Sequence, residues 1–220
     1  MENPVRCARA QGPVPTMPSA MSQYLYLVRH GEHRDAEHGV TDGPLSPRGK
    51  RQAELLAGRL GGLPLTNAWY APSMSATETA QILAARLPAV QPKASALLFD
   101  CVPSGPSPES PRAFDSWFAA VSPAEIEAGR AQMADAISEF LVPAAGERHD
   151  VLITHNFVIA WFVRHVFDAP EWRWLGVNQA HCGLTVIRVR SGRPPVLLTH
   201  NDLAHLPFEL RTGLPDTPSV

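Results

Sequence analysis

Two histidines each follow directly on an apolar run that is typical of a buried strand. His30 follows the run YLYLVR, and His155 follows the run DVLIT. In an open parallel sheet, ligands bind beyond the carboxyl ends of the strands, so the two imidazoles could meet in one pocket. Arg29, next to the first histidine, adds a planar and permanently charged fork that suits phosphate oxygens.

The rest of the chain alternates helical and strand patterns around these two points. A Ser-Pro-Ala-Glu capping box at Ser122 indicates the start of one of the helices. Helices are predicted at residues 46–60, 75–87, 122–141 and 156–167, and further strands at 67–71, 182–190 and 195–200. This alternation predicts an α/β three-layer sandwich with a mainly parallel central sheet and helices on both faces.

The length and composition favour a single globular domain. The chain has 220 residues, of which 45% are hydrophobic and 18% charged. Residues 1–22 are rich in proline and lack periodicity, so we expect a disordered tail there. The folded domain is expected over residues 23–212, with a short C-terminal tail over 213–220. The proline-rich stretch at 101–112 is interpreted as a surface loop, because apolar segments resume soon after it.

The charge and the cysteines narrow the expected partners and compartment. The formal net charge is −2 and no block of lysine and arginine is present, so no nucleic-acid partner is indicated. The odd and scattered set Cys7, Cys101 and Cys182 suggests reduced thiols, which favours a cytoplasmic location. No apolar run is long enough to cross a bilayer, so no membrane partner is expected. The oligomeric state stays open.

Three motifs in a fixed order resemble the histidine phosphatase, or phosphoglycerate mutase-like, superfamily. LVRHGE resembles the first signature of that family, PLSPRGKRQA its Leu-Thr-x-x-Gly-x-x-Gln-Ala stretch, and ITHNFVIAWFV its second histidine motif. The resemblance runs from residue 24 to about residue 205 and implies a phosphoglycerate mutase-like fold. The segment LLFDCVPSGPSPESP is similar to a branch that contains a mitochondrial serine/threonine protein phosphatase.

The resemblance also implies a role for each matching residue. His30 would attack phosphorus and become phosphohistidine, because a neutral imidazole is a good nucleophile near pH 7. Arg29, His155 and Asn156 would hold the phosphoryl oxygens together with His30. Asp100 would give a proton to the leaving alkoxide and later take one from water. Neither a metal nor another cofactor is required.

Some of these residues have alternative interpretations. Asp100 could be a turn residue before the proline-rich loop, and Glu109 and Asp115 are alternative proton donors that match the pattern less well. His33 and His38 flank acidic residues, but their spacing fits no common ligand set. We therefore expect those two histidines to be solvated loop residues and predict no metal site.

One phosphate-binding position of the family is missing. The family usually has Ser-Pro-Leu-x-Arg-Ala-x-x-Thr-Ala before its second helix, and its arginine clamps phosphate. Here the stretch reads APSMSATETA, so either Ser75 stands at the arginine position or one residue is deleted. Ser75 and Glu78 match the pattern of a capping box. The lost charge predicts a weak enzyme unless the substrate or another cation, such as Arg34 or Arg112, supplies it.

We therefore predict a metal-independent phosphatase that hydrolyses phosphomonoesters through a phosphohistidine intermediate. Its substrate would be a phosphorylated small molecule or a phosphoprotein. A phosphoglycerate mutase is the first alternative, although residues 95–122 are short for the insertion that mutases carry. A weakly active or non-catalytic protein that binds phosphorylated ligands is the second.

Overall fold

The fold is built around a mixed six-stranded sheet in the order β3-β2-β4-β1-β5-β6. The computed structural model describes residues 22–35 and 41–214. The strands are β1 (Ser22–Arg29), β2 (Asn67–Tyr70), β3 (Lys93–Ala94), β4 (Arg148–Thr154), β5 (Leu184–Arg190) and β6 (Arg193–Asp202). The expected tails lie outside the described residues, except for Ser22 in β1 and the pair Gly213 and Leu214.

The directions of the paired strands decide which chain segments meet at each end of the strands. Strands β3, β2, β4 and β1 are parallel to one another, whereas β5 is antiparallel to β1 and β6 is antiparallel to β5. In this register Arg29 lies opposite Thr154, and Val28 lies opposite Leu184. The carboxyl ends of β1 and β4 therefore lie beside the amino-terminal end of β5.

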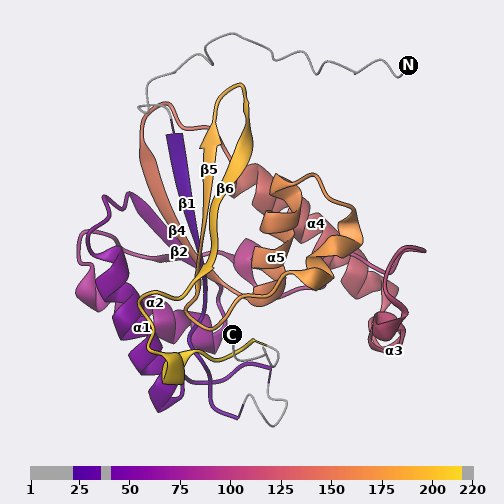
Figure 1. The fold of residues 1–220 in the computed structure, drawn as a ribbon, viewed down its shortest axis with the longest axis horizontal. Coiled ribbons are helices and arrows are strands. Elements are labelled where there is room, and N and C mark those ends of the chain that lie inside the picture. The colour runs from indigo at the N-terminus through magenta and orange to yellow at the C-terminus, as the bar shows by residue number, and fades with distance from the viewer. Residues whose placement is uncertain (1–21, 36–40, 215–220) are drawn as a thin grey trace, which may run out of the picture.

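Helices cover both faces of the sheet. Figure 1 shows α1 and α2 on one side of the strands, and α4 and α5 on the other. The helices are α1 (Pro47–Leu60), α2 (Met74–Arg86), α3 (Asp115–Phe118), α4 (Pro123–Phe140) and α5 (Asn156–Val166). The predicted α/β three-layer sandwich is confirmed, with β5 and β6 as an antiparallel addition to a parallel set. None of the helices in the described ranges is long and apolar enough to cross a membrane.

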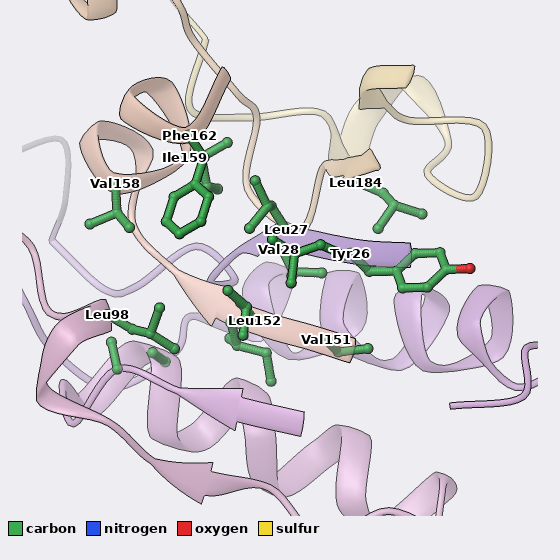
Figure 2. Packing of buried hydrophobic residues seen from close by; sticks show 14 of the residues in the cluster. Tyr26, Leu27, Val28, Leu98, Val151, Leu152, Val158, Ile159, Phe162 and Leu184 are labelled. Atoms are coloured by element: carbon green, nitrogen blue, oxygen red, sulfur yellow. The ribbon is translucent and has the colours of Figure 1, made fainter. Parts of the chain in front are cut away.

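The core holds β1, β4 and α5 together. Leu27, Leu152, Ile159 and Phe162 are fully buried, and Figure 2 shows these α5 residues packed next to the two strands. Each such side chain contributes about 1.5–3 kcal/mol when it is removed from water. Since β1 and β4 run directly into His30 and His155, this packing also fixes the starting points of the two histidines.

The helix caps agree with the sequence at two of three predicted positions. Ser46 caps α1 by accepting a hydrogen bond from the Gly49 amide at 3.0 Å. Ser122 and Glu125 form the predicted capping box at the start of α4. Both helices therefore begin where a serine side chain satisfies an amide that has no partner inside the helix.

The predicted capping box of α2 is wrong. The helix starts at Met74 and its cap is Ser73, which has an extended backbone and accepts a hydrogen bond from the Ala76 amide. Ser75 is buried inside the first turn. Glu78 instead accepts a hydrogen bond from the Leu45 amide, so it is not available for a capping box.

Candidate active site

The structure brings together the two histidines that follow β1 and β4. The His30 amide donates a hydrogen bond to the Thr154 carbonyl at 2.9 Å, which continues the parallel ladder by one residue. The imidazole rings of His30 and His155 have centroids 4.9 Å apart. Adjacent parallel strands therefore deliver both side chains to the same end of the sheet.

His30 is held in one tautomer. Its Nδ1 lies 2.9 Å from the Gly31 carbonyl oxygen, and because a carbonyl can only accept, Nδ1 must carry the hydrogen. Burial lowers the pKa of His30 well below its usual 6.5, and the neighbouring His155 and Arg29 lower it further. At neutral pH the ring is therefore uncharged, with its free lone pair on Nε2.

His155 presents a similar uncharged ring to the site. It is only 5% exposed, and its Nε2 finds no hydrogen-bond partner within the described ranges. Burial lowers the pKa of His155 to about 4, against an opposing effect of Asp42. A buried ring nitrogen without a partner costs free energy in the empty protein, so this atom is a natural contact for a bound ligand.

Two further histidines complete a cluster around His30. The rings of His33 and His181 have centroids 5.8 Å and 5.6 Å from that of His30. His33 is 6% exposed and forms an isolated bridge with Leu45, so the expectation of a solvated loop residue is wrong for it. His38 lies outside the described residues. Within the described parts of the chain, no group of His, Cys, Asp and Glu is arranged to hold a metal ion.

His181 is the site residue that sequence reasoning missed. It lies in the turn before β5, and its Nε2 is buried without a partner among the residues described. Burial lowers the pKa of His181 well below 6.5, with Arg29 as the next cause. In a wholly parallel sheet, a residue that precedes a strand lies at the opposite end of the strands from residues such as His30 that follow a strand. Recognising that β5 is antiparallel would have placed His181 with His30.

Arg29 is fixed by the chain itself. Its Nη1 donates hydrogen bonds to the carbonyls of Gln179 at 2.8 Å and Gly213 at 2.7 Å. Burial lowers the pKa of Arg29 to about 10, while the Asp100 carboxylate acts in the opposite direction. The guanidinium therefore stays charged at neutral pH. Its Nε is also buried and has no partner in the described ranges.

The segment Leu210–Gly213 closes one side of the histidine cluster. Thr212 accepts a hydrogen bond from the His181 amide through its carbonyl, and its hydroxyl lies 3.0 Å from His181 Nδ1. Gln52 of α1 donates to the Leu210 carbonyl and to the Thr212 hydroxyl. Gly213, which the sequence assigned to the tail, has φ +84°. A Cβ atom there would lie 2.6 Å from His181 Nδ1 and 2.8 Å from Arg29 Nη1.

Asp100 lies in the same cleft as His155. The cleft has a volume of about 590 Å³ and is also lined by Asp42 and Phe157. Burial raises the pKa of Asp100 to about 6, although Arg29 acts to lower it. Asp100 is an exposed residue that lines the open cleft. Asp100 can therefore hold or release a proton near neutral pH.

The alternative proton donors lie elsewhere. The Glu109 carboxylate accepts a hydrogen bond from the Trp172 indole at 3.3 Å, and Asp115 begins the short helix α3. Neither residue lines the cleft that contains His155 and Asp100. The geometry therefore favours Asp100 among the three acids considered from the sequence.

Asn156 is turned away from this cleft. It opens α5, and its Oδ1 accepts a hydrogen bond from the Gln179 amide at 2.8 Å. Its Nδ2 lies 3.4 Å from the Asn178 side-chain oxygen. Asn156 lines a neighbouring cavity instead of the cleft. The structure thus brings together Arg29, His30 and His155, with Asp100 in the cleft, and leaves Asn156 at their border.

The position of the missing arginine carries an acidic neighbour. The Ser75 hydroxyl donates to Asp42 Oδ1 at 2.9 Å, and the same carboxylate accepts from the amides of Met74 and Ser75. No lysine or arginine is among the described residues that line the cleft, so neither Arg34 nor Arg112 replaces the lost cation there.

Part of the chain matches the model of a known protein family. The model of the histidine phosphatase superfamily (branch 1) matches residues 25–99, a range that contains Arg29 and His30. Over this part of its length the chain resembles the histidine phosphatase superfamily. The proteins that it resembles are named as phosphatases and as phosphoglycerate mutases.

Individual relatives and solved structures are also similar to the chain. The chain is 28% identical over 192 residues to the serine/threonine-protein phosphatase Pgam5, mitochondrial, of Caenorhabditis briggsae; the match covers 84% of this chain and 65% of that protein. Its fold is similar to that of Bacillus stearothermophilus YhfR, with a TM-score of 0.67 and 22% identity over 83% of this chain and 98% of that one. A phosphoglycerate mutase from Bacillus anthracis gives a TM-score of 0.67 at 15% identity, over 84% and 96% of the two chains.

The expectation of a cytoplasmic location is wrong by this comparison. The Caenorhabditis briggsae relative is named as mitochondrial, and so is the Homo sapiens relative. The expectation rested on the scattered cysteines. Reduced thiols argue against a disulfide framework but do not distinguish one reducing compartment from another.

Replacing Gly213 should weaken anion binding, because its Cβ would collide with Arg29 and His181. A left-handed glycine replaced by alanine costs about 1 kcal/mol from the backbone alone. Gly192→Ala is a matched control, since Gly192 has φ +67° and no atom within 4 Å of its Cβ position. We expect Gly192→Ala to show only this backbone cost and Gly213→Ala to lose more stability because of the collision. Only Gly213→Ala should bind inorganic phosphate about 10-fold more weakly in calorimetry. Equal phosphate affinity in the two variants would contradict the role given to this contact.

The buried histidines should make the protein sensitive to acid. Below pH 6.5 the unfolded chain takes up protons that His30, His155 and His181 cannot accept while folded, because their pKa values are lowered. The unfolded state then binds more protons, so stability is fully present above pH 6.5 and falls as the pH drops toward about 4, where His155 titrates. Each histidine contributes a slope of up to ~1.4 kcal/mol per pH unit.

Urea unfolding at a series of pH values measures this slope. His155→Gln removes one titrating group of similar size and should make the slope shallower by about one proton. An unchanged slope in that variant would show that the folded His155 takes up its proton at an ordinary pKa.

Proposed function

We propose that this chain is a metal-independent phosphatase that hydrolyses phosphomonoesters through phosphohistidine on His30. The observation that carries the proposal is the free Nε2 lone pair of a neutral, buried His30, set beside the unpartnered Nε2 of His155. A nucleophile must be unprotonated and fixed in orientation. Burial keeps the His30 ring neutral, and the hydrogen bond from Nδ1 to Gly31 fixes the ring and leaves Nε2 free.

In the first step, His30 Nε2 forms a bond to phosphorus while the bond from phosphorus to the ester oxygen breaks. The leaving oxygen takes the proton of Asp100, whose raised pKa of about 6 leaves part of the population protonated near neutral pH. In the second step, a water oxygen attacks phosphorus and gives its proton to Asp100. The bond from phosphorus to nitrogen then breaks, which releases phosphate and restores His30.

Three features support the binding of the transferring phosphoryl group. Arg29 supplies a positive charge next to His30, and both His155 and His181 lie beside His30 with buried nitrogens that lack partners among the described residues. The amino-terminal end of α5 begins directly after His155 and carries a partial positive charge. Such donors act where negative charge is spread over the oxygens in the transition state.

The names of relatives and of a similar structure support a class of substrate. Named relatives are serine/threonine-protein phosphatases, and a structure of similar fold is a phosphoserine phosphatase variant in complex with phosphoserine. The chain spans 65% of the length of the Caenorhabditis briggsae relative. We propose a phosphorylated small molecule or phosphoprotein as the substrate, held without a metal.

Rapid mixing with labelled phosphomonoester should leave acid-labile, base-stable phosphate on the protein. His30→Ala should lose both this label and turnover, because the proposed nucleophile is removed. His149→Ala is the control, since His149 is also buried but contacts Tyr26 away from the cluster. Full activity in His30→Ala would exclude the phosphohistidine route. Tight phosphate binding without turnover on any ester would favour the non-catalytic alternative.

The pH profile tests the proton donor. As the pH rises through about 6, Asp100 loses its proton, so kcat/KM for an alkyl phosphate should fall up to 10-fold per pH unit on this limb. Asp100→Asn should be ~10²–10⁴-fold slower on that ester and should lose this limb. A nitrophenyl phosphate needs little protonation of its leaving group and should suffer less. The phosphate ester ionises in the same way with the unmodified protein and with Asp100→Asn, so its ionisation cancels when their pH profiles are compared. If Asp100→Asn keeps the same fall in kcat/KM with rising pH, a group other than Asp100 causes that fall.

A further inference from the structure

A second cavity, with walls quite unlike those of the cleft, adjoins the histidine cluster. Its volume is about 520 Å³, and its lining is dominated by aromatic and aliphatic side chains, including Trp117, Trp174 and Val177. Asn156 and Asn178 supply its polar groups, and none of the described residues that line it is charged. A cavity of this size and character matches the sites that hold small organic ligands.

The cavity lies next to the cleft that contains His155. Phe157 lines both the cavity and the cleft that contains His155 and Asp100. Asn156, the next residue after His155, lies at the border between the two spaces. An organic group that extends past Phe157 from a phosphate at His155 would enter this cavity.

The walls of the cavity are held in place by their own contacts. Phe157 and Trp174 pack edge to face with centroids 4.8 Å apart, and Trp117 packs against both rings at 5.9 Å and 6.1 Å. The Trp174 indole also donates a hydrogen bond to the Ser104 hydroxyl at 3.0 Å. Edge-to-face aromatic contacts of this kind stabilise the cluster without filling the space between the rings and Val177.

We propose that this cavity binds the uncharged, apolar organic group of a small phosphomonoester, such as an aryl or a bulky alkyl group. The inference rests on the proposed phosphatase activity and names the substrate class of the same site. A volume of about 520 Å³ exceeds a single side chain, which favours a small molecule with a ring system over a side chain of a phosphopeptide. The absence of charge in the described lining disfavours esters whose alcohol part is ionised.

Two alkyl phosphates with similar leaving groups test the proposal. Ethyl phosphate and 2-(2-naphthyl)ethyl phosphate both release a primary alcohol, so the difference between them reports binding of the naphthyl group. We expect kcat/KM to be roughly 30-fold or more higher for the naphthyl ester, since each buried methylene-sized group is worth about 10-fold or more. A ratio near one in the unmodified protein would overturn the proposal.

Variants of the cavity walls sharpen the result. Trp117→Ala removes one wall and Val177→Phe fills the space, and either should lower the ratio of the two kcat/KM values about 10-fold. The ratio is taken within each variant, so a loss of folded protein does not affect it. Trp172→Ala is the matched control, because Trp172 does not line the cavity and contacts Arg173 and Glu109. A ratio that falls equally in the control would overturn the assignment.

Two further measurements distinguish failure of the proposed activity from failure of the proposed cavity ligand. If neither ester is turned over, the proposed activity fails, and calorimetry with the same two esters still tests the cavity: equal affinity overturns the inference. A pair of serine phosphopeptides, with phenylalanine or glycine beside the phosphoserine, tests the other occupant. A preference seen only in the peptide pair would overturn the small-molecule assignment.

Discussion

The hydrogen bond between His30 Nδ1 and the Gly31 carbonyl is the contact on which the proposed chemistry depends. Four imidazoles and the Arg29 guanidinium share one buried region, and they can coexist there only if the rings of His30, His155 and His181 stay neutral. Burial lowers the pKa values of these three rings and so keeps them uncharged. The bond to Gly31 then decides which nitrogen of His30 is free.

The topology of the sheet supplies the neighbours that this arrangement needs. Parallel pairing of β1 and β4 brings His30 beside His155, and antiparallel β5 brings His181 from the opposite direction. The end of the described chain then returns to contact Arg29 through Gly213. The same end of the sheet opens on one side to an acidic cleft and on the other to an aromatic cavity, with Phe157 between them.

Much of this arrangement could be predicted from local signals. Apolar runs predicted β1 and β4, and a serine followed by proline predicted the start of α1 and of α4. The cap of α2 was misplaced by two residues, because Ser73 and Ser75 are equivalent by residue type and only the contact with Asp42 distinguishes them. His181 was missed because the direction of β5 depends on pairing between distant segments. For the same reason, the contact between Arg29 and Gly213 has no signal in the sequence.

The tautomer and charge of His30 can be measured directly. In protein with ¹⁵N-labelled histidine, assigned by comparison with His30→Gln, the two ring nitrogens have distinct shifts when one carries a hydrogen and the other does not. We expect Nδ1 protonated, Nε2 unprotonated, and no titration of His30 near pH 6.5, because burial lowers its pKa well below that value. A free lone pair on Nδ1, or titration near the ordinary histidine pKa of about 6.5, would contradict the account.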